Sequence, residues 1–299
     1  MGTQFKFTFL FLLSGLVSGS QVRAEASAWN GRVFRVDASG FSEITQPQLI
    51  EQLAQAQIVV LGEKHNTPKV QNMQAKIVAD TVEKANAGMQ FTLAWEFLNY
   101  TDQMTTEREF TRFMAGSISG FEFLRLTQGS DQNFAYIPIL QAVADHDGQL
   151  LGVNLSREQK APVVRSGLRA LDPRLLPPGF RMGGAGYRER FEEAMGGHAT
   201  PDQMDRYFDA QCLTDDVMAY QMLGLSAYPR KFLVAGSFHT DYQDGTVARL
   251  KARAPDQPMK TVKIADASDF QSGELENHLR EFLIDAKYGQ IADFVVFVQ

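Results

Sequence analysis

The chain has 299 residues, of which 44% are hydrophobic and 21% are charged, and its formal net charge is −6. This is the composition of an ordinary globular protein, so it excludes an intrinsically disordered chain. Nucleic-acid-binding proteins usually present a basic patch. Because this chain is acidic and has no long basic run, we expect no nucleic-acid partner.

The first 24 residues have the pattern of a secretory signal peptide. Lys6 precedes an apolar run over residues 7–17, and a small-residue cleavage site ends at Ala24. The run is shorter than the ~20 residues that a membrane-spanning helix needs. We expect cleavage near Ala24, a periplasmic or secreted protein, and no stable membrane anchor in the mature chain. Cys212 is the only cysteine, so an internal disulfide is excluded.

Apolar runs alternate with helical patterns along the chain. Strands are expected over residues 31–36, 57–63, 90–97, 150–155, 231–235, 261–264 and 293–298. Helices are expected over residues 68–87, 102–115, 133–147, 157–168, 201–223, 246–254 and 274–285. Strands that alternate with helices predict an α/β fold, with a largely parallel central sheet flanked by helices.

Residues 172–197 interrupt this alternation because they are rich in proline and glycine. A long loop in a compact domain is usually functional or disordered. We interpret residues 172–225 as a loop-rich insertion plus a helical subdomain, which forms a smaller lid region over part of the site. Residues 25–299 are otherwise expected to form a single α/β domain.

Two boxes of the form G-x-x-H each follow a core strand. They are Gly62-Glu63-Lys64-His65 and Gly236-Ser237-Phe238-His239. Each histidine is therefore expected just past the carboxyl end of a strand, which is where open α/β sheets bind ligands. The two glycines are expected to allow a sharp turn and a close approach of a ligand.

Further polar residues are expected at the same edge of the sheet. Glu96 lies between Trp95 and Phe97 at the end of a predicted strand, and a buried carboxylate must be paired, bound to metal or neutralised. One alternative is that Glu96 is only a structural partner of Arg157. The candidate site residues, expected to meet in one crevice, are Glu63, His65, Glu96, Arg157 and His239.

The chain lacks several motifs that would decide its chemistry. It has no H-E-x-x-H, no paired C-x-x-C and no calcium-binding loop, so no metal site of fixed spacing is predicted. It has no G-x-S-x-G nucleophile elbow. The glycines at residues 183–186 do not follow a strand, which argues against a dinucleotide-binding loop.

The order of the motifs resembles that of the ChaN-type haem-binding proteins. The segments that carry the resemblance are residues 61–68, 95–97, 154–158, 211–219, 236–239 and 292–297. The resemblance implies an α/β core with a smaller helical part, and a role in haem binding or iron acquisition at the bacterial envelope. The wider superfamily also contains erythromycin-esterase-like hydrolases and Tiki/TraB-type proteins with proposed metalloprotease activity.

Two features depart from the family pattern. ChaN-type motifs often read His-Asp where this chain has His65-Asn66, which puts an acid–base or metal role for position 66 in doubt. Many members are lipoproteins, whereas Cys212 lies far from the expected cleavage site. A soluble periplasmic or secreted protein is therefore the expectation.

The first hypothesis is haem binding by an envelope protein. Haem iron takes a histidine, tyrosine, cysteine or methionine ligand, and the resemblance implies a tyrosine. Tyr242, which follows His239 by three residues, is the expected ligand; Tyr187 and Tyr207 are alternatives. His239 and Arg157 are the other expected haem contacts, with Arg157 pairing a propionate. A homodimer is a further expectation.

The second hypothesis is a hydrolase, either an esterase or a metalloprotease-like enzyme. His65 or His239 would act as general base on water, and Glu63 or Glu96 would orient the base or act as acid. Arg157 would stabilise an oxyanion. A divalent ion held by the two histidines and a carboxylate is chemically possible. A third interpretation is an envelope protein with a degenerate site that only binds a ligand.

Overall fold

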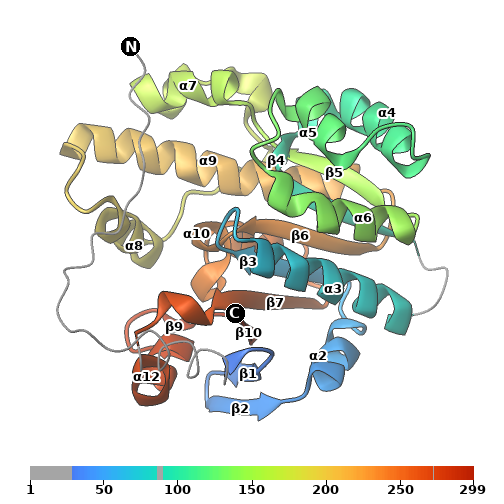
Figure 1. Cartoon of the computed structure of the whole chain (residues 1–299). Helices are drawn as coiled ribbons and strands as arrows, with labels where there is room; N and C mark the ends of the chain where they lie inside the picture. Colours follow the sequence, from blue (N-terminus) through green and yellow to red (C-terminus); the bar gives the residue numbers. More distant parts are fainter. Residues whose placement is uncertain (1–28, 86–89, 272) are drawn as a thin grey trace.

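The computed structural model of the chain describes residues 29–85, 90–271 and 273–299 (Figure 1). The expected signal peptide, residues 1–24, lies outside the described residues. Within the described part, no helix is long and apolar enough to cross a membrane.

One eight-stranded sheet forms the centre of the fold, in the order β2-β1-β10-β7-β3-β6-β4-β5. β1 pairs antiparallel with β2 and β10, and the other neighbours are parallel. The largely parallel sheet that the sequence predicts is therefore confirmed. Its strands are β1 (Val33–Asp37), β2 (Gly40–Ile44), β3 (Ile58–Glu63), β4 (Phe91–Asn99), β5 (Gln149–Asn154), β6 (Arg230–Gly236), β7 (Met259–Asp266) and β10 (Phe294–Val298). A small hairpin, β8 (Ile284–Asp285) and β9 (Gly289–Gln290), lies apart from the sheet.

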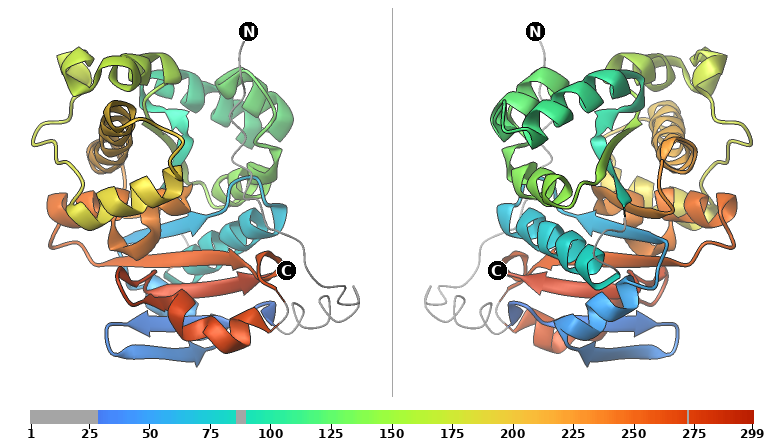
Figure 2. Two further views of the ribbon diagram at one scale, coloured as in Figure 1. Left: turned by 90° about the vertical axis from the view of Figure 1, so that its left-hand side faces the viewer. Right: turned by 90° about the vertical axis from the view of Figure 1, so that its right-hand side faces the viewer.

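Helices cover both faces of this sheet. They are α2 (Gln46–Leu53), α3 (Pro68–Ala85), α4 (Gln103–Met114), α5 (Gly120–Gln128), α6 (Ile137–Asp145), α7 (Arg157–Ser166), α8 (Ala185–Met195), α9 (Pro201–Leu225), α10 (Ser237–Thr240), α11 (Gly245–Arg253) and α12 (Glu274–Leu283). Figure 2 shows α3 and α9 on opposite sides of the sheet. This arrangement is that of a three-layer α/β fold.

The central strands bury residues on both faces, which explains why they read as continuous apolar runs. In β3, Val59 and Leu61 belong to a core that also contains side chains of α3 and α6. Ile58 and Val60 belong to a second core, formed with side chains of α9 and α11. The site at the end of β3 is therefore supported from both sides of the sheet.

Several elements differ from the sequence expectations. β2, α2 and α5 are additional elements, and α8 lies inside residues 172–197, which the sequence indicates only as loop. α8 forms because Tyr187 and Phe191, one helical turn apart, pack with Phe208 of α9. The expected end of the helix over residues 68–87 lies outside the described residues. A lid role for residues 172–225 stays a prediction.

Candidate functional site

The two G-x-x-H boxes lie side by side because β3 and β6 are parallel neighbours, with Glu63 opposite Gly236. Neither box glycine has a positive φ, so the glycines serve to leave space. A Cβ at Gly62 would lie 2.3 Å from the Thr240 Oγ1, and a Cβ at Gly236 would lie 2.6 Å from the His65 Nε2. Gly236 therefore leaves room for the histidine of the first box, and Gly62 leaves room for the threonine that directly follows the second.

Glu96 of β4 lies between the two histidines. Its Oε1 is 3.6 Å from the Nε2 of His65 and 3.7 Å from the Nε2 of His239. Its Oε2 accepts a hydrogen bond of 2.5 Å from the backbone N–H of Gly236. Glu96 is buried, and these contacts partner it, whereas no ion pair with Arg157 occurs among the described residues.

A second carboxylate lies behind His65. The Nδ1 of His65 is 2.9 Å from the Oε1 of Glu63. Glu63 is buried and also accepts hydrogen bonds from the Tyr136 hydroxyl and, at 2.8 Å, from the Gln71 amide. These contacts favour the orientation in which the Nε2 of His65 faces Glu96.

His239 has the same kind of support from another part of the chain. Its Nδ1 is 2.7 Å from the Oδ1 of Asp215, on α9. Asp215 is fully buried and accepts hydrogen bonds from the Tyr187 hydroxyl at 2.7 Å and from the Thr246 hydroxyl at 2.9 Å. The two histidines thus share one arrangement, in which a carboxylate bonded to a tyrosine holds Nδ1 and Nε2 faces Glu96.

The charges of this cluster favour protonated histidines. Burial alone would lower the pKa of His239, but the carboxylates of Glu96 and Asp215 outweigh it and raise the pKa above 6.5. Burial also opposes protonation of His65, and the hydrogen bond to Glu63 and the charge of Glu96 raise its pKa in the same way. Both imidazoles are therefore stabilised as cations between acids.

The cluster borders a cavity of about 880 Å³ at the carboxyl edge of the sheet, here called the sheet-edge crevice. Its polar lining includes Glu63, His65 and His239, and its apolar lining includes Ile264, Phe270 and Phe282. The crevice has the mixed lining typical of sites for small organic ligands.

A resident divalent ion does not fit this cluster. In residues 29–85, 90–271 and 273–299, no three His, Cys, Asp or Glu side chains are arranged to hold a metal ion. Both Nε2 atoms approach the same oxygen of Glu96. The geometry instead suits a water molecule or a polar ligand group in contact with the two imidazoles.

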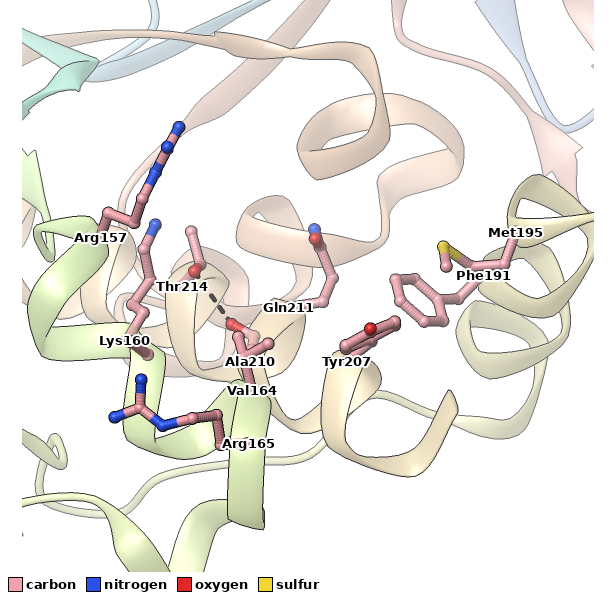
Figure 3. A pocket seen from close by; sticks show the side chains of 11 residues that line it. Arg157, Lys160, Val164, Arg165, Phe191, Met195, Tyr207, Ala210, Gln211 and Thr214 are labelled. Atoms are coloured by element: carbon pink, nitrogen blue, oxygen red, sulfur yellow. Dashed lines mark hydrogen bonds between the residues drawn. The ribbon is translucent and has the colours of Figure 1, made fainter. Parts of the chain in front are cut away.

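A second cavity, of about 510 Å³, lies between three helices and is here called the α7–α9 cleft. Its principal lining residues are Arg157, Lys160 and Arg165 of α7, Phe191 and Met195 of α8, and Tyr207, Gln211 and Thr214 of α9. Figure 3 shows the three cationic side chains on one side of the cleft and Tyr207, Phe191 and Met195 on the other. The cleft is therefore apolar at one end and positively charged at the other.

Three polar groups of the cleft have no partner among the described residues. Arg157 and Arg165 are exposed and make no ion pair or hydrogen bond with other described residues. The Tyr207 hydroxyl likewise has no hydrogen-bond partner within the part of the chain that the structure describes. Lys160 donates to the Oδ1 of Asn154 at 3.1 Å, and burial lowers its pKa. Two guanidinium groups and one phenol are free to bind a ligand.

The five candidate site residues predicted from the sequence fall into two places. Glu63, His65, Glu96 and His239 lie together at the sheet edge, as the strand ends predict. Arg157 lies in the α7–α9 cleft instead.

The other tyrosine candidates are already engaged. Tyr242 has a φ of 63° and packs against Tyr288, with a ring-centroid distance of 5.5 Å and Arg190 over its ring. It is not among the lining residues of either cavity, and burial raises its pKa to about 12. Tyr187 is buried and donates its hydroxyl proton to Asp215.

Three residues that support the histidines from behind have no role predicted from the sequence: Asp215, Tyr136 and Gln71. Asp215 and its neighbour Asp216 interrupt an otherwise apolar stretch of α9 and are fully buried. Buried acids need partners. That interruption is the sequence signal by which Asp215 could be found.

Replacing Gly236 by alanine is expected to displace His65. The added Cβ would lie 2.6 Å from the His65 Nε2 and 2.7 Å from its Cε1, so the imidazole must move away from Glu96. Overpacking of this kind costs about 1–3 kcal/mol of stability. Urea unfolding checks the stability, and NMR titration of His65 checks the loss of its contact with Glu96. Gly186→Ala, on a helix and with open space around its Cβ, is the control. An unchanged His65 titration would contradict the expectation.

The chain shares its fold with a solved structure. No curated protein matches the chain. A solved structure entitled "Cofacial heme binding to ChaN of Campylobacter jejuni" superposes with a TM-score of 0.64 at 19% identity, covering 89% of this chain and 96% of that one. The type III effector HopBA1 superposes with a TM-score of 0.43 at 11% identity, covering 84% and 91%.

A family model described as "Haem-binding uptake, Tiki superfamily, ChaN" matches residues 49–250, which include both boxes and all three cleft-forming helices. The match covers more than half of the chain. The protein therefore belongs to the ChaN family of haem-binding uptake proteins, within the Tiki superfamily.

Proposed function

We propose that the protein binds haem in the α7–α9 cleft. The observation that carries this proposal is the meeting of a free phenol, an apolar wall and unpaired guanidinium groups in one cavity. Haem is an apolar plate with two anionic propionates, and a tyrosine oxygen is one of the ligands that its iron accepts in proteins. Membership of a haem-binding family supports the same ligand.

The iron, the propionates and the porphyrin face of haem each have a matching residue in the cleft. Tyr207 offers a hydroxyl that no other described residue uses. Arg157 and Arg165 offer guanidinium groups that pair with carboxylates in a bidentate manner. Phe191 and Met195 offer apolar surface for a porphyrin face. When bound, the haem iron would be a Lewis acid, and the phenolate oxygen of Tyr207 would be its ligand.

The sheet-edge crevice fits haem less well. Its two imidazole Nε2 atoms converge on one carboxylate oxygen, so an iron bound to either would compete with Glu96. Its lysines are paired, Lys64 with Asp269 and Lys263 with Asp241. We therefore place haem against Tyr207 rather than against His239 or Tyr242.

An absorbance titration with haemin tests the proposal. Wild-type protein is expected to shift the Soret band with saturation at one site. Arg165→Glu reverses a charge that would face a propionate and is expected to weaken binding about tenfold, which corresponds to ~1.4 kcal/mol. Arg169→Glu reverses a nearby exposed arginine outside the cleft and serves as the control. Absence of a Soret shift with the wild type would refute haem binding.

A role in haem or iron acquisition at the bacterial envelope is the cellular part of the proposal. The signal-peptide pattern of residues 1–24 supports it. Expression of the full chain in a Gram-negative host, followed by fractionation, is expected to recover a periplasmic or secreted protein that begins near Glu25. Recovery of the uncleaved chain in the cytoplasm would contradict this part alone.

Hydrolysis at the sheet-edge crevice is the second candidate function. The observation that favours it is the support of each imidazole through Nδ1 by a carboxylate, which leaves Nε2 to act on water. Glu96 lies within reach of both imidazoles as an orienting group or acid.

A general base must be neutral, and the pKa values of both histidines are raised above 6.5. Any ester or peptide turnover is therefore expected to rise with pH, with a midpoint above 6.5, and to be lost in Glu96→Gln and His239→Ala. A rate that is independent of pH, or that survives both substitutions, would remove this candidate. Haemin titration of the same two variants measures haem binding separately from turnover, so the two functions can be tested independently.

A further inference from the structure

The α7–α9 cleft and the sheet-edge crevice share a wall. Gln211 lines the cleft, and its Nε2 lies 3.0 Å from the Nδ1 of His239, a residue that lines the crevice. Next to this contact, Phe191 of the cleft packs edge-on against Phe238 of the crevice, with ring centroids 5.9 Å apart. Gln211 and the Phe191–Phe238 pair therefore connect the linings of the two cavities.

The hydrogen bonds around Gln211 fix the orientation of its amide. The Tyr187 hydroxyl donates its proton to the Oδ2 of Asp215 at 2.7 Å. Its oxygen is then available as an acceptor, and the Nε2 of Gln211 donates a hydrogen bond to it at 2.9 Å. The same amide group consequently presents an N–H, not a carbonyl oxygen, toward His239.

Two hydrogen-bonding neighbours of the His239 Nδ1 require opposite protonation states of that atom. The Oδ1 of Asp215, at 2.7 Å, requires a proton on Nδ1. The amide N–H of Gln211, at 3.0 Å, requires a bare nitrogen. A ring nitrogen is either donor or acceptor, so Gln211 opposes the protonation that Asp215 favours.

Other charged groups also face His239, and each comes from a different element. Glu96 of β4 favours the imidazolium, whereas Lys160 of α7 opposes it. His65, in the segment after β3, is a second imidazole close to the same carboxylate. None of these groups both lines the cleft and contacts Nδ1; Gln211 does both.

We propose that Gln211 is a positioning residue that links occupancy of the α7–α9 cleft to the proton on His239. A porphyrin in the cleft packs against Gln211 and draws its amide away from the imidazole. Asp215 then holds a protonated Nδ1 without opposition. Because such coupling is reciprocal, protonation of His239 strengthens porphyrin binding to the same extent.

The linkage rests on the proposed haem function. It predicts the direction in which porphyrin affinity changes with pH. Porphyrin binding takes up a proton in the pH range where His239 titrates, which lies above 6.5. Affinity is therefore expected to fall as pH rises through that range, in proportion to the proton taken up. The fall is expected to be absent when the amide is removed.

NMR titration of the His239 imidazole nitrogens tests the linkage, with gallium protoporphyrin as a diamagnetic probe. Gln211→Met keeps the length of the side chain and removes the amide. In the porphyrin-free protein, this variant is expected to raise the His239 pKa by about half a pH unit or more. In the wild type, the porphyrin is expected to raise the pKa in the same direction, and in the variant to leave it unchanged.

Gln221→Met makes the same chemical change on the same helix, away from both cavities, and is expected to behave as the wild type. The linkage is overturned if Gln211→Met leaves the His239 pKa unchanged, or if the porphyrin shifts it equally in both proteins. If the absorbance spectrum of the porphyrin is unchanged by the protein, the porphyrin does not bind. That result would refute both the haem function and the linkage. The porphyrin-free comparison still decides whether Gln211 controls the proton.

Discussion

Tyr207→Phe is expected to weaken haemin binding about 100-fold, which corresponds to ~2.7 kcal/mol. The substitution removes one oxygen and leaves the shape of the α7–α9 cleft intact. Because the Tyr207 hydroxyl has no partner among the described residues, its loss breaks no internal hydrogen bond. The expected loss is therefore that of the iron–oxygen bond alone, while propionate pairing and apolar packing remain.

Absorbance titration at one pH measures this effect, and the visible spectrum of the complex reports the ligand. The spectrum of a tyrosinate complex is expected for the wild type and is expected to disappear in Tyr207→Phe. Tyr220→Phe, an exposed tyrosine on the same helix, is the matched control and is expected to change neither quantity. Equal affinity and equal spectra for wild type and Tyr207→Phe would exclude Tyr207 as the ligand.

Asp216→Ala is expected to destabilise the fold by about 3–5 kcal/mol, the usual cost of breaking a buried ion pair. Asp216 is fully buried on α9. Its two oxygens accept hydrogen bonds of 2.9 and 2.6 Å from the guanidinium of Arg253 on α11. Removing the carboxylate leaves that guanidinium, itself mostly buried, without its counterion.

Equilibrium unfolding in urea measures the change, provided that the transition remains two-state. Asp202→Ala removes an exposed acid from the first turn of the same helix and is expected to cost less than ~1 kcal/mol. A cost below ~1 kcal/mol for Asp216→Ala would show that the α9–α11 pair does not stabilise the helical layer behind the sheet-edge crevice.

The central strands are predictable from the sequence because both of their faces are buried. The side chains of β3 lie alternately in two cores, Val59 and Leu61 in one and Ile58 and Val60 in the other. The strand is therefore a continuous apolar run in the sequence, bounded by Gly62. Parallel strands place their carboxyl ends at one edge, and this rule brings His65, Glu96 and His239 together without any knowledge of tertiary packing.

The supporting groups and the α7–α9 cleft are not predictable in the same way. Asp215 reaches His239 only because α9 packs along the sheet with one particular face inward, and residue spacing does not fix that rotation. Tyr207 belongs to the cleft through the packing of α7, α8 and α9. Tyr242, close to His239 in sequence, turns away because the backbone adopts positive φ at Tyr242 and Gln243.

α5 is a helix that the periodicity of the sequence does not reveal. It has nine residues and lies between the helices expected over residues 102–115 and 133–147. Its start is nevertheless encoded, since Ser119 and Glu122 form a reciprocal capping box. Local capping signals identify such helices better than periodicity does.

The position of bound iron tests the central claim most directly. Crystals of the protein with haemin, measured at the iron absorption edge, give the iron site from anomalous scattering without assumptions about the porphyrin. The account predicts one iron site in the α7–α9 cleft, within bonding distance of the Tyr207 oxygen. Iron between His65 and His239, or an ordered complex with iron bound to Tyr242, would contradict it.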